Sequence, residues 1–210
     1  MNPLLGLPEV VIEADGVALG TEDLQALAEV RVQQHLSLPT LCELAFLVTA
    51  GSCTGVAQLL PGAGLRVLIA GNSEPLFVGQ ITAVEHGYTP DHGREIRVRG
   101  YDLLHQLRKR QHVKSHVQVT TRDLARELVA DVGLTVQATE PGPLWPQLVQ
   151  HRQSDFELLQ DIAEKCGLYL TVRGTVLHLL TLQGIGETIP LVLGETLLEA
   201  RIEINADTLY

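Results

Sequence analysis

With 210 residues, the chain is long enough to bury a substantial core, either as one large domain or as two small ones. Its formal net charge of -10 argues against a protein whose main task is to neutralise phosphates, so we predict no nucleic-acid specificity. No apolar run approaches the roughly 18 residues that a membrane helix needs. The N-terminal residues MNPLLGLPEVV also lack the basic start and cleavage site of a signal peptide. We therefore predict a protein without a membrane segment that folds in the cytoplasm.

The first hundred residues are dominated by short segments of strand character separated by turns. Asp15-Gly16 is a strong turn signal, and Pro39 limits the strand after it to a sheet edge or to a strand start. Asp23 and Leu24 could open a short helix as an alternative to a strand at Ala26–Leu36, and Val56–Leu60 fits a short helical turn. Strand patterns occupy Glu9–Ala14, Val17–Leu19, Ala26–Leu36, Leu41–Val48, Leu65–Ala70, Leu76–His86 and Glu95–Arg99.

This series of strands favours a closed or nearly closed antiparallel β-barrel, because closure removes exposed strand edges. Within Leu76–His86, one face is predicted to carry Phe77, Gly79, Ile81 and Ala83. Further turns are predicted at Gly51-Ser52, Gly71–Ser73 and Thr89–Gly93.

After Tyr101 the apolar period becomes helical. One helix face is predicted from Leu103, Leu104 and Leu107, ending in the cations Arg108–Arg110, which a helix C-terminus favours. A second helix is capped by Thr120 or Thr121 and stops at Gly133; its apolar stripe is Leu124, Leu128, Val129 and Val132. The proline-rich Thr139–Pro146 is expected to be a rigid loop.

A third helix begins with a capping box, since Ser154 is followed three residues later by Glu157. Gly167 ends it, and Leu168–Val172 and Val176–Leu180 then predict a hairpin. The buried face of this helix is predicted to carry Phe156, Leu159, Ile162, Ala163 and Cys166. Beyond a loop at Leu182–Gly186, strands are predicted at Thr188–Leu193 and Leu197–Ile204, beginning a unit that Tyr210 cuts short.

The three cysteines, Cys42, Cys53 and Cys166, are odd in number and lie in apolar surroundings, which indicates buried thiols rather than disulfides. His112 and His116 are four residues apart, but the valines around them favour an extended segment and no third ligand is near in sequence. We therefore predict no metal site and no cofactor.

The basic segment Arg108–Lys114 fits either a solvated helix end or a contact with an acidic face of a neighbouring protein. Trp145 fits equally an exposed anchor for a partner and a plug for the core.

No residues are predicted to be catalytic. Asp155 with Glu157, and Asp161 with Glu164, lie where carboxylates serve capping and solubility. The candidate nucleophiles Ser52, Ser73 and Ser154 lack a nucleophile elbow, and the loop 62–64 lacks the lysine of a phosphate-binding loop. We therefore predict that the chain is not an enzyme.

Three segments in this order resemble the phage late control protein D and VgrG family: YDLLHQLRKR at 101–110, TRDLARELVADVGL at 121–134 and SDFELLQDIAEKCGLYLTV at 154–172. Members of that family form the hub of contractile tails and related injection machines. The resemblance implies an α+β fold with a first tube-like β-barrel at 1–100, a helical and hairpin region at 101–180, and the incomplete start of a second β-barrel at 181–210.

The resemblance also implies a homotrimer, in which three copies with two barrels each match a sixfold tail tube and carry a threefold spike. The expected partners are the tail tube protein and the spike and baseplate proteins, with assembly in the cytoplasm into a virion tail or injection particle. Family members usually continue into a complete second barrel and often into a needle, so piercing and effector delivery are not assigned to these residues.

Two other functions stay open, a tail-associated wall-degrading hydrolase and a monomeric barrel that binds carbohydrate or protein. The first needs an acid in a cleft of aromatic side chains, and the chain has four tyrosines and one tryptophan. The sequence leaves open whether the machine is a phage tail, a type VI apparatus or an extracellular injection particle.

Overall fold

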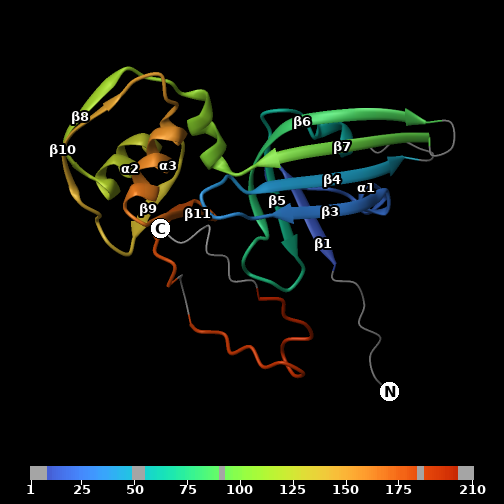
Figure 1. Ribbon diagram of the computed structural model, residues 1–210. Coiled ribbons are helices and arrows are strands. Elements are labelled where there is room, and N and C mark those ends of the chain that lie inside the picture. Colours follow the sequence, from blue (N-terminus) through green and yellow to red (C-terminus); the bar gives the residue numbers. More distant parts are fainter. Residues whose placement is uncertain (1–8, 49–54, 90–92, 184–186, 203–210) are drawn as a thin grey trace.

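The computed structural model describes residues 9–48, 55–89, 93–183 and 187–202. Two bodies lie side by side, one built on a large sheet and the other on helices with two small sheets, and a C-terminal segment runs beneath them (Figure 1). The predicted α+β class is confirmed. The turn at Gly51-Ser52, the thiol of Cys53 and the middle of the turn Thr89–Gly93 lie outside the described residues.

The first body is a seven-stranded antiparallel sheet in the order β2-β1-β5-β6-β7-β4-β3. A short helix α1 (Thr21–Gln25) and a 3₁₀ turn η1 (Val56–Gln58) accompany it. The predicted strands therefore form, and so does the alternative helix at Asp23 and Leu24. The strand bounds are β1 Val10–Ala14, β2 Val17–Ala18, β3 Leu27–Gln33, β4 Leu41–Val48, β5 Gly64–Ile69, β6 Phe77–Thr89 and β7 Gly93–Tyr101.

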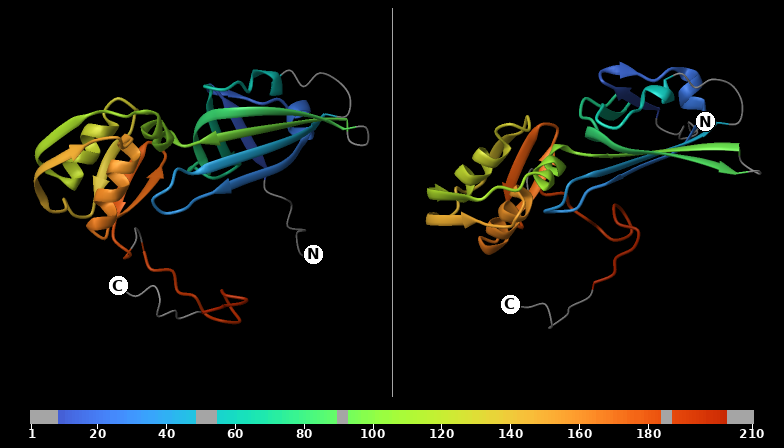
Figure 2. Two further views of the ribbon diagram at one scale, coloured as in Figure 1. Left: turned by 45° about the horizontal axis from the view of Figure 1, so that its top comes forward. Right: turned by 90° about the horizontal axis from the view of Figure 1, so that it is seen from above.

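The sheet folds over into two layers but does not close, so the predicted barrel closure is wrong (Figure 2). Its edges are β2 and β3, and β2 has only two residues, both exposed. On the open side the buried Asp23 side chain of α1 accepts hydrogen bonds from the backbone N–H of Gly55 and of Val56, at 3.1 and 3.2 Å. These bonds tie α1 to η1.

The core between the two layers is aliphatic, with Phe46, Leu44, Ile12 and Ile81 among its largest fully buried side chains. Gly79 lies where β6 meets the end of β7, and a Cβ there would come within 2.2 Å of the Tyr101 carbonyl oxygen. The two backbones can approach this closely only because residue 79 has no side chain.

Two local features of the sheet differ from prediction. A register shift between Ile81 and Ala83 breaks the alternation of β6, so Ala83 is exposed although it was predicted on the same face as Phe77 and Ile81, which are buried. Pro39 is followed by β4, which lies between β3 and β7. The strand-start alternative for this proline is therefore correct and the edge alternative is wrong.

In the second body three helical segments pack over two small sheets. The helical segments are η2 Leu103–Lys109, α2 Thr121–Val129 and α3 Asp155–Lys165. One sheet pairs β8 (Lys114–Thr120) with β10 (Leu144–Gln150), and the other has the order β11-β12-β9, from Tyr169–Arg173, Val176–Leu180 and Thr135–Ala138. The β12–β9 pair is parallel.

The predicted starts of the second and third helices are confirmed. Both α2 and α3 start with capping boxes, Thr120 with Asp123 and Ser154 with Glu157. Gly167 directly follows the C-cap of α3 and has φ of 65°, as glycine beyond a helix C-terminus should. The second helix ends earlier than predicted, at Val129 rather than at Gly133, whose φ is 78°. The side chains of the predicted α3 face are buried apart from Cys166, which is half-buried.

The prediction of a rigid loop over Thr139–Pro146 is wrong at its C-terminal end, because β10 starts at Leu144 and includes Pro146. Trp145 and Gln147 pair with Val119 and Val117, whereas Pro146 has no partner in the register. A proline is tolerated in a two-stranded sheet because its missing N–H can face away from the partner.

The predicted strands at Thr188–Leu193 and Leu197–Ile204 do not form within residues 187–202. The chain instead turns back at Val192, whose carbonyl oxygen accepts from the backbone N–H of Thr196 and of Leu197, both at 3.0 Å. A strand needs a neighbour to pair with, and the described part of the chain provides none here.

Candidate interaction surfaces

The two bodies are joined by the loop after β3. The backbone N–H of Ser37 donates to the Leu170 carbonyl oxygen at 2.7 Å, and the Leu170 N–H donates to the Ser37 hydroxyl at 3.2 Å. The Thr40 N–H donates to Asp102 Oδ2 at 2.7 Å. Asp102 also caps η2 by accepting from the Leu104 N–H at 3.0 Å. The junction is therefore an ordered set of buried bonds.

Asp102 is a residue that our sequence reasoning missed, although an aspartate directly before a helical run is a capping signal. Burial raises the pKa of its carboxyl, while the hydrogen bonds from Thr40 and Leu104 oppose that shift. A groove of about 660 Å³ runs along this junction, with Val32, Phe77 and Val172 among the side chains of its walls and Arg173 at its rim. It is a candidate contact surface.

The outer face of the large sheet carries charges of both signs in neighbouring strands. Glu43 of β4 lies between Arg31 of β3 and Arg99 of β7, at 4.0 and 3.1 Å. On β7, Arg97 and Glu95 form a further pair at 2.8 Å. Exposed pairs of this kind contribute little to stability, so we interpret this face as solvated.

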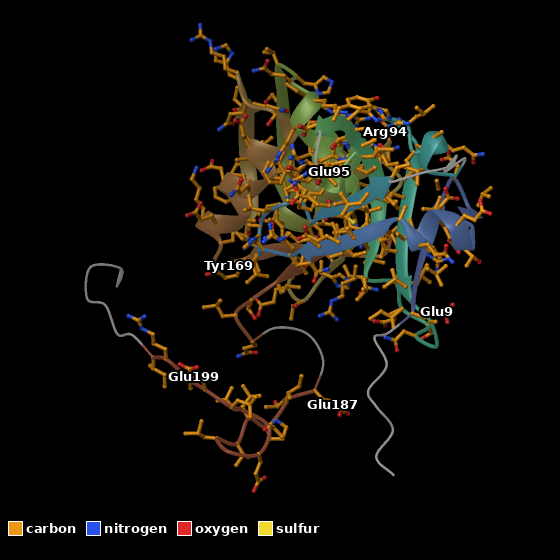
Figure 3. The ribbon with its side chains drawn as sticks, turned by 90° about the vertical axis from the view of Figure 1, so that its right-hand side faces the viewer. Glu9, Arg94, Glu95, Tyr169, Glu187 and Glu199 are labelled. Carbon is orange, nitrogen blue, oxygen red and sulfur yellow. The ribbon has the colours of Figure 1, made fainter. Side chains whose placement is uncertain are left out.

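The C-terminal segment 187–202 exposes large apolar side chains. Figure 3 shows Glu187 and Glu199 on a stretch that lies apart from both bodies. Clustered apolar exposure of this kind marks a contact surface in a soluble protein. The exposed apolar side chains of the segment are Ile189, Leu191, Val192, Leu193, Leu198 and Ile202.

The two histidines considered as metal ligands do not come together. His112 is mainly exposed, and its Nδ1 lies 3.2 Å from Asp155 Oδ1, whereas the buried His116 has its Nδ1 3.0 Å from Glu127 Oε2. They also lie on an extended segment rather than a helix, as the flanking valines indicated. Among the residues described, no group of three or more potential ligands is close enough to hold a metal ion.

The basic segment Arg108–Lys114 is largely engaged within the chain. The Arg108 guanidinium lies 4.8 Å from the ring centroid of Phe156, and Arg110 is 3.8 Å from Asp131. Lys114 forms an ion pair with Glu127. These contacts favour the interpretation of Arg108–Lys114 as a solvated helix end over its interpretation as a surface that contacts an acidic neighbouring protein.

The carboxylates have structural partners. Glu157 accepts from the Ser154 backbone N–H at 2.7 Å and from its hydroxyl at 2.9 Å, and these bonds lower the pKa of Glu157. Asp155 is buried and accepts from Gln150 Nε2 at 2.8 Å. Asp161 pairs with Lys165 at 2.7 Å. These carboxylates, and Ser154 among the candidate nucleophiles, thus cap or brace α3.

Trp145 is half-buried and packs against the core of the second body, with Nε1 3.4 Å from the Thr121 hydroxyl, which fits the plug rather than the exposed anchor. Burial raises the pKa of the Cys42 thiol to about 12, with Glu43 adding to the effect, so this thiol is unreactive near neutral pH. Cys166, predicted to be buried, is half-exposed because the helix ends at this residue.

No helix within the described ranges is long and apolar enough to cross a membrane.

Solved structures with the same fold come from tails and secretion systems. The 43 kDa tail protein of prophage MuSo2 from Shewanella oneidensis has a TM-score of 0.65 and 18% identity, covering 82% of this chain and 54% of that protein. An Escherichia coli component of the type VI secretion system, described as structurally similar to bacteriophage T4 tail proteins, has a TM-score of 0.61 and 11% identity, covering 84% of this chain and 50% of that one.

A chain of the Francisella PdpA–VgrG complex has a TM-score of 0.56 and 11% identity, covering 85% of this chain and 32% of that one. The resemblance to phage tail and VgrG proteins is thereby confirmed. The chain spans about half the length of the first two relatives.

No curated protein matches the sequence. The sequence profile described as the Alg8 N-terminal domain matches residues 52–210, which is most of the chain. The chain therefore belongs to the Alg8 N-terminal domain family.

Proposed function

We propose that the chain is a structural subunit at the hub of a contractile injection apparatus. The observation that carries this proposal is the similarity of its fold, over more than 80% of its length, to both a phage tail protein and a type VI secretion component. In this role the chain makes and breaks no bonds. The engagement of its carboxylates and histidines in caps and ion pairs supports that part of the proposal.

The proposed hub is a homotrimer that matches a sixfold tail tube on one side and a threefold spike on the other. Residues 1–100 would contribute one tube-facing unit, 101–180 the helical and hairpin unit, and 181–210 the start of a second tube-facing unit. The open edges β2 and β3 support this arrangement, because an unpaired strand edge is a template for contact with another chain. The partners are the tube protein and the spike and baseplate proteins, within a virion tail or injection particle.

The exposed apolar segment 187–202 is the part of the chain that most needs such a partner. Ile189, Leu191 and Leu193 are two residues apart and would share one face of a strand, while Val192 between them is also apolar and exposed. We propose that this segment becomes strand only in the assembled hub, where a neighbouring surface covers that face.

Light scattering on the purified protein tests the oligomer, with an expected mass of three times the 22.9 kDa chain. Changing both Leu191 and Leu193 to Asp should shift the protein to monomer. Val113→Asp is the matched control, because Val113 is equally apolar and 80% exposed but lies on the second body. A second readout is binding to hexameric rings of the tube protein. A monomer at all concentrations that also ignores the tube rings would overturn the proposal.

A further inference from the structure

A hollow of about 420 Å³ lies between α2 and the β9–β12 pair of the second body. Arg122 and Arg126, four residues apart on α2, supply one wall. Gln137 of β9 and His178 of β12 supply the other, where they are register partners in the parallel pair. The hollow is thus lined by two arginines of α2 and by residues of the β9–β12 pair.

The cations of this hollow have Asp123 nearby, whose pKa is lowered by its hydrogen bonds with Thr120 and by the charges of Arg122 and Arg126. The Nε of Arg122 is buried and has no hydrogen-bond partner among the described residues. Arg126 approaches a carboxylate only at 3.9 Å, from NH1 to Asp123 Oδ1. A buried donor without a partner costs free energy, which an incoming acceptor recovers. In a chain with a net charge of -10, this pairing of arginines is an exception to the general acidity.

His178 belongs to the strand that borders the hollow, and the cation that acts on its imidazole is Arg173. Burial lowers the pKa of His178, and the nearby Arg173 lowers it further. Near pH 7 the imidazole is therefore uncharged and can donate through one ring nitrogen while accepting through the other.

One side of the hollow is an unpaired strand edge. β9 ends the sheet β11-β12-β9, and in the described chain no strand lies on its other side. The Thr135 and Thr139 N–H groups donate to the Thr175 and Leu179 carbonyl oxygens, at 3.0 and 3.2 Å. Because backbone groups of successive residues point to opposite sides of a strand, those of Val136 and Ala138 point to the open side. A peptide added there would pair with β9.

We propose that this hollow, here called the arginine site, binds an extended acidic segment of a partner protein. The segment adds to the free edge of β9, and its carboxylates pair with Arg122 and Arg126. Guanidinium and carboxylate match in a planar, two-bond geometry, which gives direction as well as attraction. A nucleic acid fits less well, because it has no peptide backbone to pair with the free edge of β9. The site goes beyond the proposed hub function and can be tested without it.

The test measures fluorescence anisotropy of a labelled eight-residue peptide in which glutamate alternates with threonine, added to the full chain. The double variant R122Q/R126Q should weaken binding by on the order of tenfold or more, since hydrogen bonds to charged groups are worth that much. R31Q/R99Q is the matched control, because these arginines lie on the outer face of the large sheet. It should leave binding unchanged. Circular dichroism confirms that each variant is folded.

Two altered peptides test the same site without changing the protein. A peptide with glutamine in place of glutamate should lose binding if charge is needed, and one with N-methyl groups on alternate backbone nitrogens should lose it if β9 pairing is needed. Equal binding of the glutamate and glutamine peptides, or unchanged binding to R122Q/R126Q, would overturn the proposal. Binding of inorganic phosphate without binding of the peptide would also overturn it, in favour of a small-anion site.

Discussion

The large sheet and the helix–hairpin body are held together by different kinds of contact. The sheet depends on residues far apart in sequence, such as β4 packed between β3 and β7 and Gly79 pressed against the Tyr101 backbone. The second body also has long-range pairs, such as β9 with β12, but its helices α2 and α3 begin with local capping boxes. Each body also has its own buried cluster. One chain can therefore contain a unit held by long-range strand pairing and a unit whose helices are specified by local signals. Four predictions test this difference.

The largest effect is expected from Leu159→Ala, which empties a fully buried position in the cluster of the second body. The free energy of unfolding should fall by about 3 kcal/mol, the usual cost of such a cavity. Amide hydrogen exchange should accelerate across 103–180 and much less across 10–101.

Leu44→Ala in the sheet cluster is the reciprocal control and should show the opposite pattern. Equal acceleration in both bodies after either change would mean that they unfold as one cooperative unit, and the comparison would fail.

Gly79→Ala should lower the free energy of unfolding by about 2 kcal/mol, because the new methyl group overpacks the site and forces β6 away from the Tyr101 carbonyl. Urea denaturation measures this change. Gly87→Ala, on the same strand, is the matched control, since the nearest atom to a Cβ there is 3.7 Å away. Similar losses in the free energy of unfolding for both variants would show that strand flexibility, rather than close backbone approach, causes the effect of Gly79→Ala.

Ser154→Ala should cost about 1 kcal/mol in the free energy of unfolding, since it removes the hydroxyl that accepts from the Glu157 N–H at the start of α3. The same measurement on Ser115→Ala, an exposed serine in β8, should show almost no change. A negligible effect at position 154 would mean that α3 is held by packing alone, against the local account of the second body.

The smallest effect concerns pH. The hydrogen bonds of Ser154 lower the pKa of Glu157 in the folded state below its ordinary value of 4.5. The resulting stabilisation is fully present above that ordinary value and is lost as the pH falls through the folded pKa. The stability difference between the natural protein and Glu157→Gln should therefore vanish at low pH. A difference that grows with acidification would contradict the capping role.

The helix starts of the second body could be predicted from the sequence because they depend on local signals. Ser154 with Glu157, and Gly167 after Cys166, determine the helix start and end within a few residues of chain. The same holds for the Asp15-Gly16 turn of the first sheet, where φ is 49° and 79°. Closure of the sheet could not be predicted in this way, because it depends on whether the short β2 reaches β3 across the fold.

The remaining errors also arise from tertiary context. The shift at Ala83 arises from the pairing of β6 with β7, and β10 forms through Pro146 because β8 lies beside it. Among the interaction surfaces, the basic segment 108–114 was visible in sequence but proved to be engaged. Arg122 and Arg126 are also a visible pair at helical spacing, yet their importance appears only when β9 and β12 are placed beside them.

The paired bonds of Ser37 with Leu170 and of Thr40 with Asp102 have a mechanical consequence. A single tether would let the two bodies swivel, whereas two anchor points on one short loop resist both bending and torque. We therefore expect a force on the large sheet to be transmitted to the β11–β12 hairpin rather than to cause movement about a hinge.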